Sequence, residues 1–82
     1  LAIPQALKSA REQIRAGERS AARIRSLIRR RLRKVGAKID YVSVAEGQRL
    51  TELTRIEGEI AISLACTIAG VRLIDNVTLK VK

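Results

Sequence analysis

The sequence predicts an α+β fold in which two N-terminal helices pack on a small, about three-stranded antiparallel sheet that ends in a β-hairpin. Three observations support this fold class. Apolar residues recur every three or four positions as far as residue 36, they alternate with polar residues in the second half, and a two-residue Ala-Gly spacing separates the last two alternating segments. Helices and strands that are segregated along the chain favour an α+β architecture. The length of 82 residues allows one domain.

The first helix is expected before Gly17, a residue type that commonly ends a helix in the left-handed conformation. Pro4 fits the first turn, where a missing N–H costs little. The apolar stripe that should face the sheet consists of Ile3, Leu7, Ala10 and Ile14.

The second helix is expected between Ser20, a suitable N-cap residue, and Gly36. Basic residues crowd its last two turns, where cations interact favourably with the helix dipole. Its apolar stripe consists of Ile24, Leu27, Ile28, Leu32 and Val35, and the basic residues are Arg29, Arg30, Arg31, Arg33 and Lys34.

Three segments have the composition or the alternation of strands: residues 38–45, 59–68 and 71–81. Residues 50–55 fit either a single helical turn or an ordered loop. If the turn places Ile68 opposite Val71, one sheet face becomes almost entirely apolar. The other pairs are then Cys66 with Leu73, Ile62 with Val77, Ile60 with Leu79 and, as the exception, Leu64 with Asp75. A shift of one residue would turn this apolar row to water, so we expect this register, with the helices covering the row.

The opposite face of the 59–68 strand carries the small residues Ala61, Ser63, Ala65 and Thr67. These positions are either exposed or packed against an element outside the chain. The Asp75-Asn76 pair interrupts the apolar alternation of the last strand. Side chains of this type bond to nearby backbone and stabilise a bend or bulge, and we expect the Asp75 carboxylate to bond to backbone N–H groups or to Arg72. The second interpretation is that the pair contacts a ligand or a neighbouring domain.

The composition excludes several classes of function. There is no histidine and one cysteine, which excludes a Cys/His zinc site, a histidine triad and an internal disulfide. Cys66 lies in the apolar row, so it fits a small buried hydrophobe better than a nucleophile that lacks a histidine base. No segment approaches the ~20 apolar residues of a membrane span. No signal peptide is recognisable, and we expect a cytoplasmic protein.

The net charge of +9 is unevenly distributed, because twelve of the seventeen basic residues but only two of the eight acidic ones lie between residues 8 and 38. Such a basic helix pair either binds a polyanion or is simply a solvated surface. Tyr41 is the only aromatic residue, which is a poor platform for stacking single-stranded bases. A small basic nucleic-acid-binding module and a purely structural dimerisation domain therefore remain as alternatives.

Five short segments follow one another in an order and spacing that match a known family. They are Arg15-Ala16-Gly17-Glu18-Arg19, Asp40-Tyr41-Val42, Leu53-Thr54, Ala61-Ile62-Ser63-Leu64-Ala65-Cys66 and Gly70-Val71-Arg72-Leu73-Ile74-Asp75-Asn76. The chain thus resembles the C-terminal domain of the pantothenate synthetase (pantoate–β-alanine ligase) family over essentially its whole length. The residues of the final motif that carry the resemblance are Gly70, Arg72, Leu73, Asp75 and Asn76.

The resemblance implies that residues 1–82 are a single lid domain from a longer chain whose N-terminal, Rossmann-like catalytic domain is absent. The lack of methionine, with Leu1 as first residue, leads to the same expectation. The family's parent enzyme uses ATP to convert pantoate to a pantoyl adenylate and pyrophosphate. β-Alanine then attacks the adenylate to give pantothenate, a coenzyme A precursor, and AMP. Magnesium accompanies the ATP.

The family's catalytic and nucleotide-binding positions have no counterpart in this sequence. The resemblance therefore implies no catalytic, cofactor-binding or metal-binding residue here, and an isolated domain without activity. The implied partner is the enzyme's own N-terminal domain, with pantoate, β-alanine and ATP as ligands of the parent and a homodimer as its assembly. Neither a membrane nor a nucleic acid is an expected partner.

Overall fold

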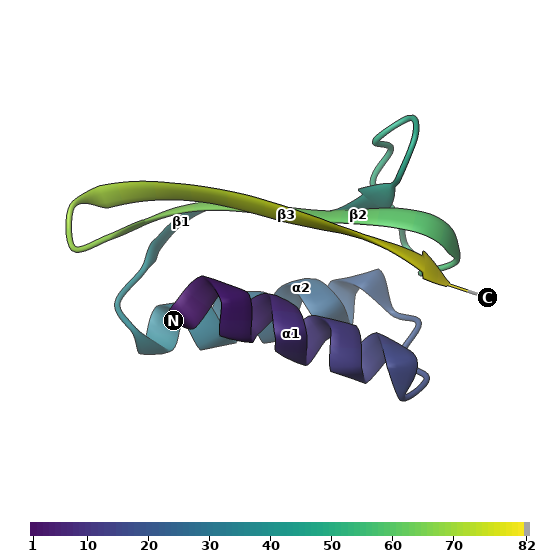
Figure 1. The fold of residues 1–82 in the computed structure, drawn as a ribbon, viewed down its shortest axis with the longest axis horizontal. Coiled ribbons are helices and arrows are strands. Elements are labelled where there is room, and N and C mark those ends of the chain that lie inside the picture. Colours follow the sequence, from purple (N-terminus) through teal and green to yellow (C-terminus); the bar gives the residue numbers. More distant parts are fainter. Residues whose placement is uncertain (82) are drawn as a thin grey trace.

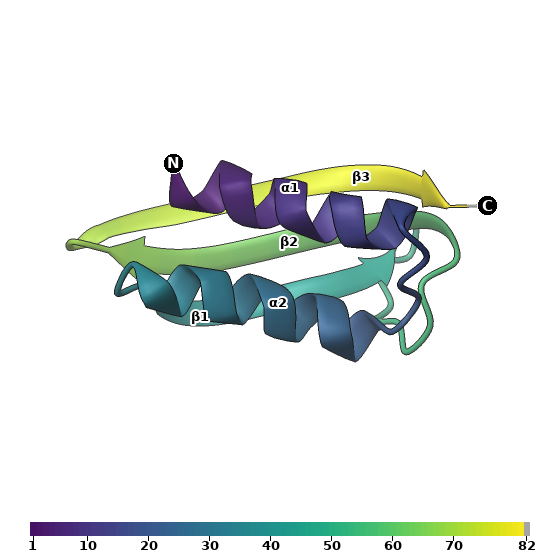
Figure 2. The same ribbon diagram turned by 90° about the horizontal axis from the view of Figure 1, so that it is seen from below.

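Two helices lie side by side on one face of a three-stranded antiparallel sheet in the computed structural model, which describes residues 1–81 (Figures 1 and 2). The element order is α1 (Ala2–Arg15), α2 (Ala21–Lys34), β1 (Lys38–Glu46), β2 (Gly58–Ile68) and β3 (Val71–Val81). The predicted α+β class is confirmed, and the helices cover the sheet face that was expected to be apolar.

Both helices begin and end close to the expected residues. Gly17 follows α1 with a φ of +114°. Ser20 is the N-cap of α2, and its hydroxyl accepts a hydrogen bond of 3.2 Å from the Arg23 N–H. The predicted stripes are buried, except that Leu27 is half-buried and Val35 is 49% exposed. The assignment of Val35 to the buried stripe is wrong because it is the C-cap residue, where the chain has already left helical geometry.

The sheet has the order β1-β2-β3, and all five predicted β2–β3 pairs are present. This pairing runs without interruption from Gly58 opposite Val81 to Ile68 opposite Val71. The bend or bulge expected at Asp75-Asn76 is therefore wrong. The irregularity lies instead in β1, where the pairing with β2 shifts between Ile39 and Tyr41.

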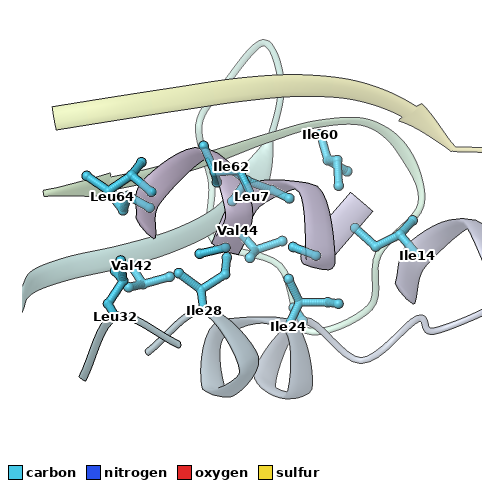
Figure 3. Close-up of a cluster of buried hydrophobic side chains, with 14 of the residues drawn as sticks. Leu7, Ile14, Ile24, Ile28, Leu32, Val42, Val44, Ile60, Ile62 and Leu64 are labelled. Atoms are coloured by element: carbon cyan, nitrogen blue, oxygen red, sulfur yellow. The ribbon is translucent and has the colours of Figure 1, made fainter. Parts of the chain in front are cut away.

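The core between the two layers consists of aliphatic side chains and one cysteine. Figure 3 shows Ile28 and its neighbours on α2 pointing toward residues of β1 and β2. Ile28, Val44 and Ile62 are all 0% exposed. Because branched aliphatic side chains occupy few rotamers, they can interlock at high density between the layers.

Residues 50–55 form an ordered loop, which decides between the two alternatives left by the sequence. The Leu53 N–H donates to the Val44 carbonyl oxygen at 2.9 Å, and Glu52 forms an isolated bridge with Ala45. On the outer face of β2, Ala65 lies between Tyr41 on β1 and Ile74 on β3, whereas Ala61 and Ser63 lie opposite Ala45 and Ser43. Ala65 is 0% exposed, so its burial does not require a partner from outside the chain.

Replacing Ile28 tests the packing between the layers. Ile28→Ala removes a fully buried side chain and leaves a cavity, so the free energy of unfolding should fall by about 2–5 kcal/mol. Chemical denaturation of the 82-residue chain measures this change. Leu50→Ala is the control, because Leu50 is 66% exposed and its loss should change stability little. Equal effects of the two substitutions would contradict the assigned core.

The β2–β3 turn offers a stabilising substitution. Ala69 and Gly70 have φ values of 51° and 80°, and the left-handed region is unfavourable for alanine. Ala69→Asn creates the Asn-Gly pair that such two-residue turns prefer and should raise the free energy of unfolding by about 0.5–1 kcal/mol. Ala16→Asn, at an exposed position with a φ of −79°, should give no comparable gain. A lower melting temperature for Ala69→Asn would refute this turn geometry.

Candidate functional site

The predicted motif residues of the last segment are spread over both faces of the β2–β3 hairpin. Gly70 is the second turn residue. Leu73 and Asp75 lie opposite Cys66 and Leu64 and therefore share the helix-facing side of the sheet. The structure does not bring the five residues together at one point.

Arg72 and Asp75 do not form the ion pair that was expected as one alternative. The Arg72 guanidinium Nη1 lies 3.0 Å from Asp40 Oδ2, across β2 on β1. The Asp75 carboxylate accepts a 2.8 Å hydrogen bond from the Asn76 N–H, in agreement with the other alternative, a bond to backbone. Asp75 is half-buried and borders a hollow of about 470 Å³ that is otherwise lined by apolar residues.

The outward surface of α2 carries most of the excess positive charge. Arg29, Arg30, Arg33 and Lys34 line a shallow hollow of about 590 Å³ together with Ser26. Within residues 1–81 none of these four cations forms an ion pair, and no aromatic residue lines the hollow. The arrangement provides positive potential, but it lacks a stacking surface for bases.

Arg25 is the one arginine of α2 whose side chain holds other elements in place. Its Nη2 donates to Glu52 Oε1 at 2.8 Å and to the Leu53 carbonyl oxygen at 2.7 Å, and also contacts the Val44 carbonyl at 3.2 Å. The Ser43 hydroxyl and the Val44 N–H donate to the same Glu52 carboxylate. Arg25 thereby joins α2, β1 and the 47–57 loop.

Glu52 is consequently held in its charged form. Partial burial raises the pKa of Glu52, but the hydrogen bonds from Ser43, Val44 and Arg25, with the charge of Arg25, outweigh this effect and lower the pKa overall. No local sequence pattern indicates this pair. Its partners are 27 residues apart and neither belongs to a recognisable motif.

The Arg15–Arg19 motif forms the joint between the helices. The Arg19 Nη1 donates to the Ile14 carbonyl at 2.7 Å, at the end of α1, where this oxygen also accepts the Gly17 N–H at 3.1 Å. The Arg19 carbonyl accepts a 2.8 Å bond from the Ile56 N–H. The Glu18 carboxylate accepts hydrogen bonds from the Ser20 and Arg19 N–H groups at the start of α2, and these lower its pKa together with the charge of Arg23. The motif is therefore explained by helix termination and loop attachment.

Reactive and metal-binding side chains are poorly placed in the part of the chain that the structure describes. Cys66 is 0% exposed, and burial, with a smaller effect from the charge of Asp40, raises the pKa of its thiol. Residues 1–81 contain no group of three or more side chains that could hold a metal ion. Neither α1 nor α2 has the length and apolarity needed to cross a membrane.

Comparison with known proteins gives a consistent match. A family model for pantoate-beta-alanine ligase matches residues 1–78. The chain is 37% identical over 81 residues to pantothenate synthetase from Clostridium botulinum (strain Langeland), 40% over 76 residues to that of Anaeromyxobacter dehalogenans and 39% over 80 residues to that of Geobacillus kaustophilus. These alignments include 93–98% of this chain but only 26–29% of each relative.

The same relationship is visible in the fold. The crystal structure of pantothenate synthetase from Thermus thermophilus matches 93% of this chain with a TM-score of 0.82 and 26% sequence identity. The match involves 28% of that protein's chain. This chain therefore spans a little over a quarter of the length of the relatives that it matches.

Removing Arg25 tests the role of the Arg25–Glu52 pair. Arg25→Ala leaves the Leu53 and Val44 carbonyls without this donor and should lower the free energy of unfolding by about 1–3 kcal/mol. Arg31→Ala, at an exposed position of the same helix, should change it by less than about 0.5 kcal/mol. Denaturation at neutral pH compares the two variants.

The pH dependence of stability gives a second readout of the same pair. Because the pKa of Glu52 is lower in the folded chain than its ordinary value of 4.5, its ionised form stabilises the fold above about pH 4.5. This contribution is lost as the pH falls through the folded pKa. The difference in stability between the parent chain and Arg25→Ala should therefore shrink below pH 4.5. A difference that stays constant with pH would contradict a role for the ionised carboxylate.

Proposed function

Because the chain belongs to the pantoate-beta-alanine ligase family, we propose that it is the C-terminal lid domain of a longer, ATP-dependent pantothenate synthetase. The observation that carries this proposal is the agreement of nearly the whole chain, in sequence and in fold, with about a quarter of such enzymes. A similarity that fills one chain and only part of the other is what a domain of a larger protein produces.

The proposed reaction of the complete enzyme has two steps. The carboxylate of pantoate attacks the α-phosphorus of ATP, which gives pantoyl adenylate and releases pyrophosphate. The amine of β-alanine then attacks the acyl carbon, an amide bond forms and AMP leaves. Pantothenate, AMP and pyrophosphate are the products. We place this enzyme in the cytoplasm, as a homodimer.

The residues of this chain do not fit the binding of ATP phosphates or magnesium. The described part contains no cluster of metal-ligating side chains, and no glycine in the sequence is followed by Lys-Ser or Lys-Thr as in a phosphate-binding loop. We therefore assign the nucleotide and its magnesium to the part of the ligase outside this chain.

The role that we propose for this domain is the exclusion of water. An acyl adenylate hydrolyses in water, and a domain that closes over it protects it until the amine arrives. A rigid two-layer unit with a dry aliphatic core suits this role, because it can move as one body. The basic surface of α2 is the single feature in favour of a nucleic-acid-binding module, and the family relationship does not favour that alternative.

The complete gene product tests this proposal. It should form pantothenate from pantoate, β-alanine and ATP, with one AMP released per pantothenate, whereas residues 1–82 alone should form none. Replacing the domain by a flexible linker should leave ATP binding largely intact but release AMP in excess of pantothenate, because the adenylate leaks and hydrolyses. Full coupling without the domain would rule out the lid role, and pantothenate formation by residues 1–82 alone would overturn the division of labour between the domains.

Charge reversal on α2 separates this role from direct binding of ATP by the basic surface. Arg30 and Arg33 are exposed and line the basic hollow of α2, and we expect them to be dispensable for the reaction. Their double replacement by glutamate in the complete enzyme should change the affinity for ATP by less than about tenfold. A larger loss of affinity would place the basic surface of α2 at the nucleotide.

A further inference from the structure

The N-terminus, the end of α2 and the β2–β3 turn lie at the same end of the molecule (Figures 1 and 2). Apolar side chains from these three segments line one hollow. We name this surface the apolar end patch. It is formed by Leu1, Pro4, Val35, Ile68 and Leu73, which line the hollow of about 470 Å³.

The apolar end patch is unusual on a surface that is otherwise strongly basic. Leu1, Val35 and Leu73 are three of the seven large hydrophobic residues that are exposed among residues 1–81, and Val71, on the same sheet face as Leu73, is a fourth. Val35 is 49% exposed and Leu73 36%. Contiguous apolar surface of this kind on a folded domain marks an interaction site.

We propose that the apolar end patch is the surface on which this domain docks against the part of the same ligase chain that precedes Leu1. This inference rests on the proposed function. The relatives are three to four times as long as this chain, so the proposed enzyme has about three quarters of its residues elsewhere. Leu1 lies within the patch, so preceding residues emerge there. A tethered partner is present at a high effective concentration.

Charge argues against a second copy of this domain as the occupant. Each copy carries a net charge of +9, which opposes close approach of two copies. The patch itself contains a single acidic side chain, Asp75, at its border. An intramolecular partner can place an N–H group or a guanidinium near that carboxylate without bringing a second +9 charge.

Asp75 indicates the chemistry of the docking segment. One of its oxygens accepts the Asn76 N–H, and within residues 1–81 its other oxygen has no hydrogen-bond partner. β3 is also an edge strand, so its outward backbone groups are not paired within the sheet. The segment that fits this surface has apolar side chains for the hollow and a hydrogen-bond donor for Asp75. This assigns Asp75 to contact with a neighbouring domain.

Thiol labelling of the complete ligase tests the docking at two exposed apolar positions. Val35 is 49% exposed and lines the hollow, whereas Leu50 is 66% exposed and lies in the 47–57 loop, outside the patch. Val35→Cys and Leu50→Cys are prepared separately in the complete chain, and their reaction with a thiol reagent is followed by mass spectrometry. Each rate is divided by the rate for the same variant unfolded in urea. Leu73→Cys is the second patch variant, should Val35→Cys fail to fold.

If the patch is covered by the preceding part of the chain, the Val35→Cys thiol should react about tenfold more slowly than the Leu50→Cys thiol. This protection should not change on extensive dilution. Equal rates would overturn the proposal, and protection that disappears on dilution would assign the patch to a second copy instead. Pantothenate formation by the unsubstituted enzyme is assayed in parallel, so a failure of docking with activity intact is distinguishable from a failure of the proposed function.

Discussion

The structure depends on the burial of one aliphatic row of β2 beneath the two helices. Ile60, Ile62 and Leu64 are 0% exposed and form the sheet side of this contact, while Ile24 and Ile28 belong to the helix side. Among the described residues no polar or charged side chain is buried. The layers are therefore held by the removal of apolar surface from water and by close packing, with no buried polar network to specify them.

The polar contacts at the periphery have a different function, which is to attach the connections to this core. Arg19 joins the end of α1 to the residue that leads into β2, and Arg25 fastens the 47–57 loop to α2 and β1. Arg19 bonds to the Ile14 carbonyl near the end of α1, and Arg25 bonds to the carbonyls of Val44 on β1 and Leu53 in the loop. These bonds add to the backbone hydrogen bonds that the Ile14 and Val44 carbonyls already accept, and they tie the connected segments to one another.

The elements and the β2–β3 register follow from local sequence patterns, because periodicity and a two-residue turn act over short distances. The contacts of Arg25 and Arg72 could not be predicted in this way. Arg25 contacts Glu52, which lies 27 residues away in the sequence. Arg72 contacts Asp40 where the register of β1 shifts, and no pattern in the β1 sequence predicts that shift. Asp75 stands out in the sequence because it interrupts an apolar row, but the sequence did not predict that it lies in a regularly paired strand. The apolar end patch combines residues from three separate segments and is visible only after folding.

The same difference between local sequence patterns and contacts of distant residues applies to function. The family motifs are carried largely by residues that end a helix, form a turn or pair strands, so they identify the domain without revealing chemistry.

We expect the helices and β2 to unfold as one cooperative unit. Native-state hydrogen exchange on the 82-residue chain tests it most directly. The amides of Ile28 on α2 and of Ile62 on β2 should exchange only through global unfolding, with equal free energies of opening. Exchange at Ile28 that is about a hundredfold faster than at Ile62 would show that the helices detach from an intact sheet, and would contradict this account.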